Sequence, residues 1–330
     1  MNRKKTASGA EITVITACFN EQAVLPLFWQ RLRPVFRELE SGGIRPRLIL
    51  VDDGSRDGTW REMEKICRQD SRVSGFSFSR NFGQAASLTC GYREATGDAV
   101  VSLDCDLQDP PELIPSMVKA WRKGAKIVYA RRRSRLKDTW FKRITAATFY
   151  RLFRWLTGVE APGQVGDFRL IDRVVVDALN EMGERGRFFR GLVAWTGFPS
   201  AMVEYDRPER PAGVSKYPFR KMFHFAHRGI SSFTTLPLYL GFFFGLLLLG
   251  VVGLYLTYAL AVHWFWGVPF ERGWLSLILA QVLIGALLFL CIGTVGVYVA
   301  HLFDEAKARP DYLVSRRISG GAKKLESVSS

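Results

Sequence analysis

The sequence has few cysteines and histidines, and they form no recognisable metal-binding or disulfide pattern. Its 330 residues include five cysteines and four histidines, with no CxxC and no His-x-His. The cysteines are scattered, at Cys18, Cys67, Cys90, Cys105 and Cys291. We therefore expect neither a disulfide framework nor a structural zinc site, and a reducing compartment fits the composition. No apolar segment follows the basic start MNRKKTASGAE, so no secretory signal peptide is expected.

Two common nucleotide-binding fingerprints are also missing. No GxGxxG follows the first expected strand, and no GxxxxGK(S/T) occurs in the chain. Their absence argues against a dinucleotide-binding loop and against a P-loop. The chain also shows no internal repeat and no low-complexity stretch.

Acidic residues are scarce relative to basic ones. The chain has 46 Lys+Arg against 31 Asp+Glu, which gives a net charge of +15. Such an excess indicates an anionic partner: nucleic acid, an anionic membrane surface or a phosphate-rich substrate. A mean hydropathy of +0.03 and 13% aromatic residues exclude a disordered basic tail protein.

Charge is absent from two long apolar runs in the C-terminal third. They cover Leu236–Val262 and Gly273–Ala300, and each exceeds the roughly 20 residues that a helix needs to cross a bilayer. We expect transmembrane helices at 235–262 and 274–301, joined by a short external loop at 263–273. Basic residues before the first run and in the tail 302–330 favour the cytoplasm for both. The sequence thus predicts a two-span protein of the cell inner membrane, with its large N-terminal domain and its C-terminus cytoplasmic.

The N-terminal part alternates between strand-like and helix-like segments. Strands are expected at Ile12–Cys18, Arg47–Val51, Ser74–Phe78, Ala99–Leu103 and Lys126–Ala130. Helices are expected at Glu21–Glu40, Asp57–Gln69, Gln84–Ala95 and Pro111–Lys123. The alternation predicts an α/β fold with a Rossmann-like, mostly parallel sheet, which binds ligands beyond the carboxyl ends of its strands. We assign 1–10 to a basic tail, 11–215 to this domain and 216–234 to a juxtamembrane amphipathic helix.

Acidic side chains follow three of the expected strands. The first strand leads into Asn20-Glu21, the second into Asp52-Asp53, and the fourth into Asp104-Cys105-Asp106. Two residues apart on extended backbone, Asp104 and Asp106 share a face and can hold Mg²⁺ or Mn²⁺. Each piece taken separately also fits a turn or a helix cap. Three acidic strand ends in one α/β pattern favour a binding site.

Long stretches of the chain resemble one enzyme family. The motifs are TACFNE, VDDGSRDGT, NFGQ, ATGDAVVSLDCDLQDPPELI, VGDFRLIDR and the later RPERPAGVSKYPFRK. The sequence is similar to inverting family 2 glycosyltransferases with a GT-A fold. Within them it looks most like the polyprenyl-phosphate branch, which includes dolichyl-phosphate mannose synthases and bacterial undecaprenyl-phosphate glucosyltransferases.

The resemblance implies a nucleotide-sugar donor, a divalent metal and a homo-oligomer, with a tetramer as one form. It places the donor at Ala17, Asn20, Glu21, Asp52, Asp53, Gln84 and Asp104, and the metal at Asp104, Asp106 and Gln108. It also makes Asp104, Asp106 and Asp167 the expected catalytic residues. For Asp167 three roles stay open: orienting the donor sugar, acting as a base, or capping a turn beside Arg169.

Basic residues concentrate in a segment that suits an anionic lipid acceptor. Residues 119–154 carry thirteen Lys+Arg and one acid, Asp138. Two amphipathic helices expected at 140–156 and 217–233 fit a membrane interface, although packing on their own domain is the alternative. We expect a polyprenyl phosphate acceptor bound by Arg131, Arg143, Arg169, Arg210, Ser215 and Lys216. Solvated surface charge is the alternative for each, and Arg131 cannot be separated from its two neighbouring arginines. Nucleic acid is not expected as a partner, because no nucleic-acid motif is visible.

The predicted activity is transfer of one sugar to a polyprenyl phosphate at the cytoplasmic membrane face. UDP-glucose is the expected donor, and undecaprenyl phosphate the expected acceptor. Alternatives are another sugar donor, a processive polysaccharide synthase, or a scaffold that binds a nucleotide sugar without turnover. The synthase alternative is weakened because Arg151–Trp155 gives RxxRW and not QxxRW.

Overall fold

The computed structural model describes residues 9–133, 165–184, 187–205, 273–320 and 326–327, and some of the residues between 247 and 267. The chain divides into two compact units. The first, the catalytic unit, comprises residues 1–221 together with 310–330. The second, the apolar unit, comprises residues 222–309.

The described residues of the catalytic unit form a nine-stranded sheet with the order β7-β5-β6-β4-β1-β2-β3-β8-β9. The strands are β1 (Glu11–Cys18), β2 (Arg45–Asp52), β3 (Val73–Phe78), β4 (Ala99–Ser102), β5 (Ile127–Arg132), β6 (Val165–Asp172), β7 (Ser200–Tyr205), β8 (Val314–Ile318) and β9 (Glu326–Ser327). Strands β3, β2, β1 and β4 run parallel and form its centre. Strand β6 is antiparallel to both β4 and β5, and β8 is antiparallel to β3.

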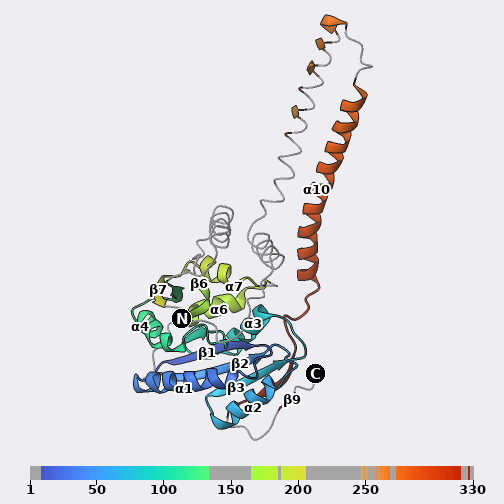
Figure 1. The fold of residues 1–330 in the computed structure, drawn as a ribbon. Helices are drawn as coiled ribbons and strands as arrows, with labels where there is room; N and C mark the ends of the chain where they lie inside the picture. Colours follow the sequence, from blue (N-terminus) through green and yellow to red (C-terminus); the bar gives the residue numbers. More distant parts are fainter. Residues whose placement is uncertain are drawn as a thin grey trace. The chain divides into compact units, whose positions relative to one another are not determined.

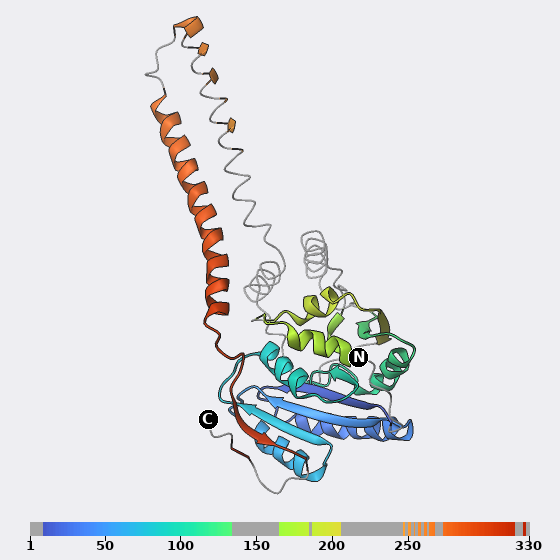
Figure 2. The same cartoon turned by 180° about the vertical axis from the view of Figure 1, so that it is seen from behind.

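Helices cover both faces of this sheet (Figures 1 and 2). They are α1 (Leu25–Ser41), α2 (Thr59–Gln69), α3 (Gln84–Glu94), the short 3-10 helix η1 (Pro111–Leu113), α4 (Ile114–Arg122), α6 (Arg173–Glu181) and α7 (Phe189–Trp195). Helix α1 begins with a proline in its first turn and buries one apolar stripe, which includes Phe28, Leu32 and Phe36. On the opposite face Gly91 of α3 lies so close to Ile15 that an added Cβ would come within 3.0 Å of its side chain.

The expected alternation of strands and helices through the first five strands is confirmed to within a few residues. The sheet is mixed, however, and less parallel than expected: β6 is inserted between β4 and β5. Alternating apolar residues decide which face of a strand is buried, but they do not set its direction. The direction of β6 was therefore outside the reach of the sequence pattern.

The C-terminal segment, expected to be a plain cytoplasmic tail, contains strand β8. Ile318 of β8 pairs with Gly75 of β3 and is only 2% exposed. The ring of Tyr312 stacks on Phe78 at 4.9 Å between centroids. Arg317 also donates to Glu94 at 2.8 Å. The chain therefore leaves the catalytic unit, passes through the apolar unit and returns to complete the same sheet.

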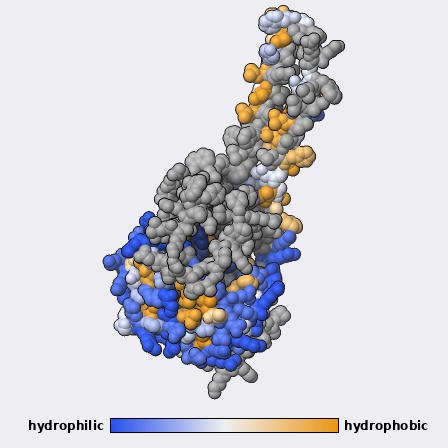
Figure 3. Space-filling view, in the orientation of Figure 1, coloured by the Kyte–Doolittle hydropathy of each residue, from blue (hydrophilic) through white to orange (hydrophobic). Residues whose placement is uncertain are grey.

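In the apolar unit the structure describes one long helix, α10 (Trp274–Ala306). Its stretch Leu283–Ala300 has a mean hydropathy of 2.4 and, by length and composition, could cross a membrane. Among the described residues it is the one helix with this property. Figure 3 shows apolar side chains along the described part of this helix and mainly hydrophilic ones over the described surface of the catalytic unit. The expected first span and the two amphipathic helices at 140–156 and 217–233 lie largely or wholly outside the described residues.

Candidate active site

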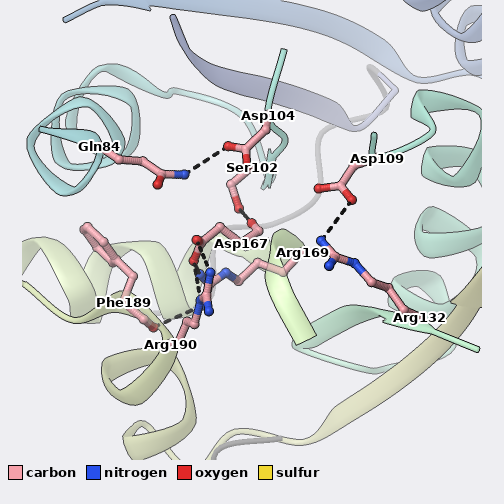
Figure 4. A network of polar contacts seen from close by, with 9 residues as sticks. All are labelled: Gln84, Ser102, Asp104, Asp109, Arg132, Asp167, Arg169, Phe189 and Arg190. Carbon is pink, nitrogen blue, oxygen red and sulfur yellow. Dashed lines mark hydrogen bonds and ion pairs between the residues drawn. The ribbon is translucent and has the colours of Figure 1, made fainter. Parts of the chain in front are cut away.

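The pairing of β4 with β6 brings two predicted catalytic acids together. Ser102, the last residue of β4, pairs with Arg169 of β6. Continuing this antiparallel register two residues brings Asp104 level with Asp167, and the two lie near each other in Figure 4. The Ser102 hydroxyl donates to the carbonyl oxygen of Asp167 at 2.5 Å, which ties the two strand ends together.

Asp104 lies in an electrostatically unfavourable place for a carboxylate. Burial raises its pKa to about 7, and the negative charges of Asp167, Asp109 and Asp106 add to this effect. The side chain of Gln84, at the start of α3, donates to Asp104 Oδ1 at 3.0 Å. The ionised form of Asp104 therefore lacks a sufficient positive partner within the described residues.

Asp167 is in the opposite situation. Arg169 Nη2 donates to Oδ1 at 2.6 Å, and Arg190 of α7 donates Nη2 to Oδ2 at 2.9 Å and Nε to Oδ1 at 3.3 Å. Burial would raise the pKa of Asp167, but Arg190 and Arg169 outweigh burial and hold the pKa below its ordinary value. The carboxylate is fixed in place and ionised.

The loop after β4 carries the expected metal ligands. Asp106 Oδ1 accepts from the backbone N–H of Gln108 at 3.1 Å. Between them Leu107 has φ of +61°, a left-handed conformation that is uncommon for a residue other than glycine. Gln108 is 3% exposed, and its Nε2 has no hydrogen-bond partner in the described residues. Among those residues no three His, Cys, Asp or Glu side chains are grouped to hold a metal ion.

The acids after β2 are engaged in shaping the loops around the site. Asp52 is 1% exposed and accepts from the Ser77 hydroxyl at 2.7 Å and from the backbone N–H of Ser55 at 2.9 Å. Asp53 accepts from the backbone N–H groups of Phe82 and Gly83 at 2.7 and 2.9 Å. It thereby fixes the loop that leads into α3 and Gln84. Burial is the main cause of a raised pKa for Asp53.

The loop after β1 is joined to the loop after β2. Asn20, with φ of +57°, donates its backbone N–H to Ser55 Oγ at 2.9 Å. The backbone N–H of Glu21 donates to Thr59 Oγ1 at 2.8 Å. Ala17 contributes its carbonyl oxygen, which accepts from the Cys105 thiol at 3.4 Å. The expected donor residues thus gather at the carboxyl edge of β1, β2 and β4, and their contact with a donor stays a prediction.

The structure separates two of the three adjacent arginines at the end of β5. Side chains alternate along a strand, so Arg131 shares a sheet face with Tyr129, which pairs with Arg169. The Arg131 side chain is 44% exposed, and its acidic neighbour among the described residues is Glu204 at 3.8 Å. Arg132 lies beside Asp109 at 3.7 Å (Figure 4). Arg131 is therefore the more available of the two for an external anion.

The remaining residues expected at the acceptor divide into two groups. Arg169 is fully buried, and it donates to Asp167 and to the carbonyl oxygen of Phe189. The others lie outside the described residues: Arg143, Arg210, Ser215 and Lys216. Binding of phosphate by these residues stays a prediction.

Comparison with known proteins identifies the family. The profile described as Glycosyl transferase family 2 matches residues 13–179. This chain belongs to glycosyltransferase family 2. It is 40% identical over 93% of its length to the uncharacterized glycosyltransferase YkcC of Bacillus subtilis, of which it covers 94%. It is 36% identical, over 93% of this chain and 99% of the relative, to the bactoprenol glucosyl transferase of Shigella phage SfX.

One solved structure of similar fold is glucosyl-3-phosphoglycerate synthase from Mycobacterium tuberculosis with Mn²⁺, UDP-glucose and phosphoglyceric acid. It shares 20% identity with this glycosyltransferase and a TM-score of 0.45, over 68% of this chain and 78% of that one.

Two groups in the glycosyltransferase site were not anticipated from the sequence. Arg190 reaches Asp167 from α7, a helix of seven residues. Asp109 is 4% exposed and accepts from the Tyr205 hydroxyl at 2.5 Å, beside Arg132. Arg190 follows Phe188-Phe189, and an arginine beside two aromatic residues is not a pattern that indicates an active site. The alternation in β7 predicts a buried Tyr205, but not its partner.

Proposed function

We propose that this glycosyltransferase moves a single sugar from UDP-glucose to undecaprenyl phosphate at the cytoplasmic membrane face, with inversion at the anomeric carbon. One observation carries the proposal: the match to the bactoprenol glucosyl transferase of Shigella phage SfX spans 307 residues and 99% of that protein. It therefore extends well beyond the family domain that ends at residue 179. The same chemistry with another nucleotide sugar is the second candidate.

The acceptor explains why the site needs no strong base. A phosphate monoester has a second pKa of about 6 and is largely dianionic at neutral pH. One of its oxygens attacks C1 of the sugar, while the bond from C1 to the β-phosphate oxygen breaks and its electron pair leaves with the nucleoside diphosphate. No proton has to be removed from the acceptor. The protein's task is to position both substrates and to balance charge.

The described residues fit these tasks. Asp167 is held ionised by Arg169 and Arg190, so it suits orientation of a sugar hydroxyl better than proton abstraction. Arg131, on the same sheet face as Arg169, is exposed and fits an acceptor phosphate. Arg143, Arg210, Ser215 and Lys216 complete the proposed acceptor site, as the resemblance implies, whereas the fully buried Arg169 binds Asp167 instead of an external phosphate. The donor would lie at the carboxyl ends of β1 and β2 and the loops that follow them, where Ala17, Asn20, Glu21, Asp52 and Asp53 are found, and beside Gln84 at the start of α3.

The loop after β4 fits a divalent metal, Mg²⁺ or Mn²⁺. Burial and three neighbouring acids disfavour the ionised form of Asp104, and a divalent cation would relieve this. Such ions are often held by one or two carboxylates together with substrate phosphates, so Asp104, Asp106 and Gln108 suffice without a third acid. When bound, the ion would stabilise the departing nucleoside diphosphate.

The chain path supports a two-span hairpin. Strands β3 and β8 belong to one sheet, although the apolar unit lies between them in sequence. A chain that begins and ends on one side of a membrane must cross it an even number of times. One crossing by α10 therefore requires a second, and the uncharged run 236–262 is the proposed partner. A Gly267→Cys variant tests this: a membrane-impermeant maleimide should label it in intact cells, unlike the wild type. Labelling only after lysis would contradict the hairpin.

A donor screen tests the proposed activity. Membranes that contain the protein would be incubated with undecaprenyl phosphate and radiolabelled UDP-glucose, UDP-galactose, UDP-N-acetylglucosamine or GDP-mannose. We expect label in the chloroform-soluble lipid from UDP-glucose, with an inverted anomeric configuration by NMR. Label from a different donor would correct the sugar, and a long polymer would indicate a processive synthase. Lack of a labelled lipid from any donor would refute the proposal, and Asp104→Ala supplies the inactive control.

A further inference from the structure

Arg190 closes a ring of contacts around Asp167. Arg169 joins two points: its Nη2 donates to Asp167, and its Nη1 donates to the carbonyl oxygen of Phe189 at 3.0 Å. Phe189 is the first residue of α7, and Arg190 is the next. Arg190 then returns to Asp167 with two N–H donors, as Figure 4 shows. Asp167, Arg169 and the start of α7 thus hold one another in a fixed geometry.

Helix α7 is anchored firmly enough to hold Arg190 in place. Three apolar side chains of this helix are at most 3% exposed: Phe189, Leu192 and Val193. The Phe189 ring packs against Tyr92 of α3 at 5.2 Å between centroids. Because Phe189 is buried on one side and its carbonyl oxygen is bound by Arg169, the direction of the next side chain is largely determined. The packing of α7 therefore determines that Arg190 reaches Asp167.

The two arginines differ in what they can do. The Arg169 side chain is 1% exposed and is enclosed by the protein. The Arg190 side chain is 34% exposed and contacts Asp167, which is itself 14% exposed. Arg169 thus fits a structural role inside the protein, whereas Arg190 lies at the surface of the site, where it fits a role in the reaction.

We propose that Arg190 is a positioning residue for sugar transfer: it holds the Asp167 carboxylate in the orientation needed to receive a donor-sugar hydroxyl. This inference rests on the proposed function, since it assigns Asp167 an orienting role in that reaction. Two parallel N–H donors from a planar guanidinium specify the plane of a carboxylate, which a lysine ammonium cannot do. Arg190 acts through Asp167 and need not touch the substrate.

Kinetics of Arg190→Gln and Arg190→Lys test this role. A misplacement of about 1 Å in a reacting group can cost about 10²-fold in rate, so Arg190→Gln should lower kcat by about that factor. The KM values for donor and lipid phosphate should change less than kcat, because Asp167 acts mainly on reaction geometry. Arg190→Lys should recover part of the loss, because it keeps the charge but not the two-point contact. The control is Arg61→Gln, which removes an exposed arginine from α2.

The outcomes separate positioning from mere structure and from failure of the proposed reaction. The inference is overturned if Arg190→Gln keeps the wild-type kcat. It is also overturned if the glutamine and lysine variants lose activity equally and both unfold at a lower temperature in proportion, because that would mark a structural contact. If the wild-type enzyme forms no lipid-linked sugar with any donor, the proposed function fails instead.

Discussion

The returning strand β8 should contribute directly to the stability of the catalytic unit. Ile318 at its end is 2% exposed and belongs to the core under α1 and α2. Its Cγ2 lies 3.0 Å from the point where a Cβ would stand on Gly75, and the side chains of Cys67 and Met63 lie nearby. The pocket that receives Ile318 is therefore built from residues of α2 and β3. We predict that Ile318→Ala destabilises the whole unit, although the residue lies beyond α10 in sequence.

The size of the effect follows from burial. Isoleucine has three more carbon atoms than alanine, and burial of each contributes about 0.8 kcal/mol. The transfer term is then roughly 2.4 kcal/mol, and the cavity left behind raises the total to about 3 kcal/mol or more. In a domain of this size 1 kcal/mol lowers Tm by about 2–4 °C, so the expected loss is about 6–12 °C.

Thermal unfolding of the detergent-solubilised protein, followed by intrinsic fluorescence, measures this change. Leu313→Ala is the matched control, because Leu313 lies in the same segment but is 53% exposed. We expect a small shift in Tm for the control and the full loss for Ile318→Ala. If the two variants unfold at the same temperature, β8 is not part of the cooperative catalytic unit. That result would also remove the main support for an even number of membrane crossings.

Three further predictions concern the site. Asp104→Asn should abolish transfer while leaving Tm unchanged or raised, because the buried carboxylate is surrounded by other acids; a clear fall in Tm would contradict this reasoning. Asp53→Ala should lower Tm by a few degrees and raise the donor KM, because two backbone N–H groups lose their acceptor; unchanged values of both would refute it. Arg131→Gln should raise the KM for lipid phosphate about tenfold with little change in Tm, whereas Arg132→Gln should mainly lower Tm; the reverse pattern would exchange their roles.

Much of the catalytic unit was predictable because its pattern is local. The strands and helices through β5 follow from apolar periodicity, and acids after several strands indicated where a site would form. The proximity of Asp104 to Asp167 depends on the register of β4 with β6, and these two strands are far apart in sequence. The docking of β8 on β3 depends on a return across the apolar unit, which no local pattern encodes. Arg190 was missed for the same reason: its importance comes from one long-range partner.

The two neighbouring acids of the site, Asp104 and Asp167, have opposite pKa shifts because their surroundings differ. Asp104 and Asp167 are both partly buried carboxylates at neighbouring strand ends, yet the pKa of Asp104 is raised to about 7 and that of Asp167 is lowered. The difference comes from arginines: within the described part of the chain Asp167 receives N–H donors from Arg169 and Arg190, whereas Asp104 receives the neutral amide of Gln84. A carboxylate without a cation of its own is suited to acquire one with the substrate, and a carboxylate already neutralised is suited to hold a fixed orientation. Opposite environments for the same functional group therefore agree with the roles proposed above: metal and diphosphate binding at Asp104, and sugar orientation at Asp167.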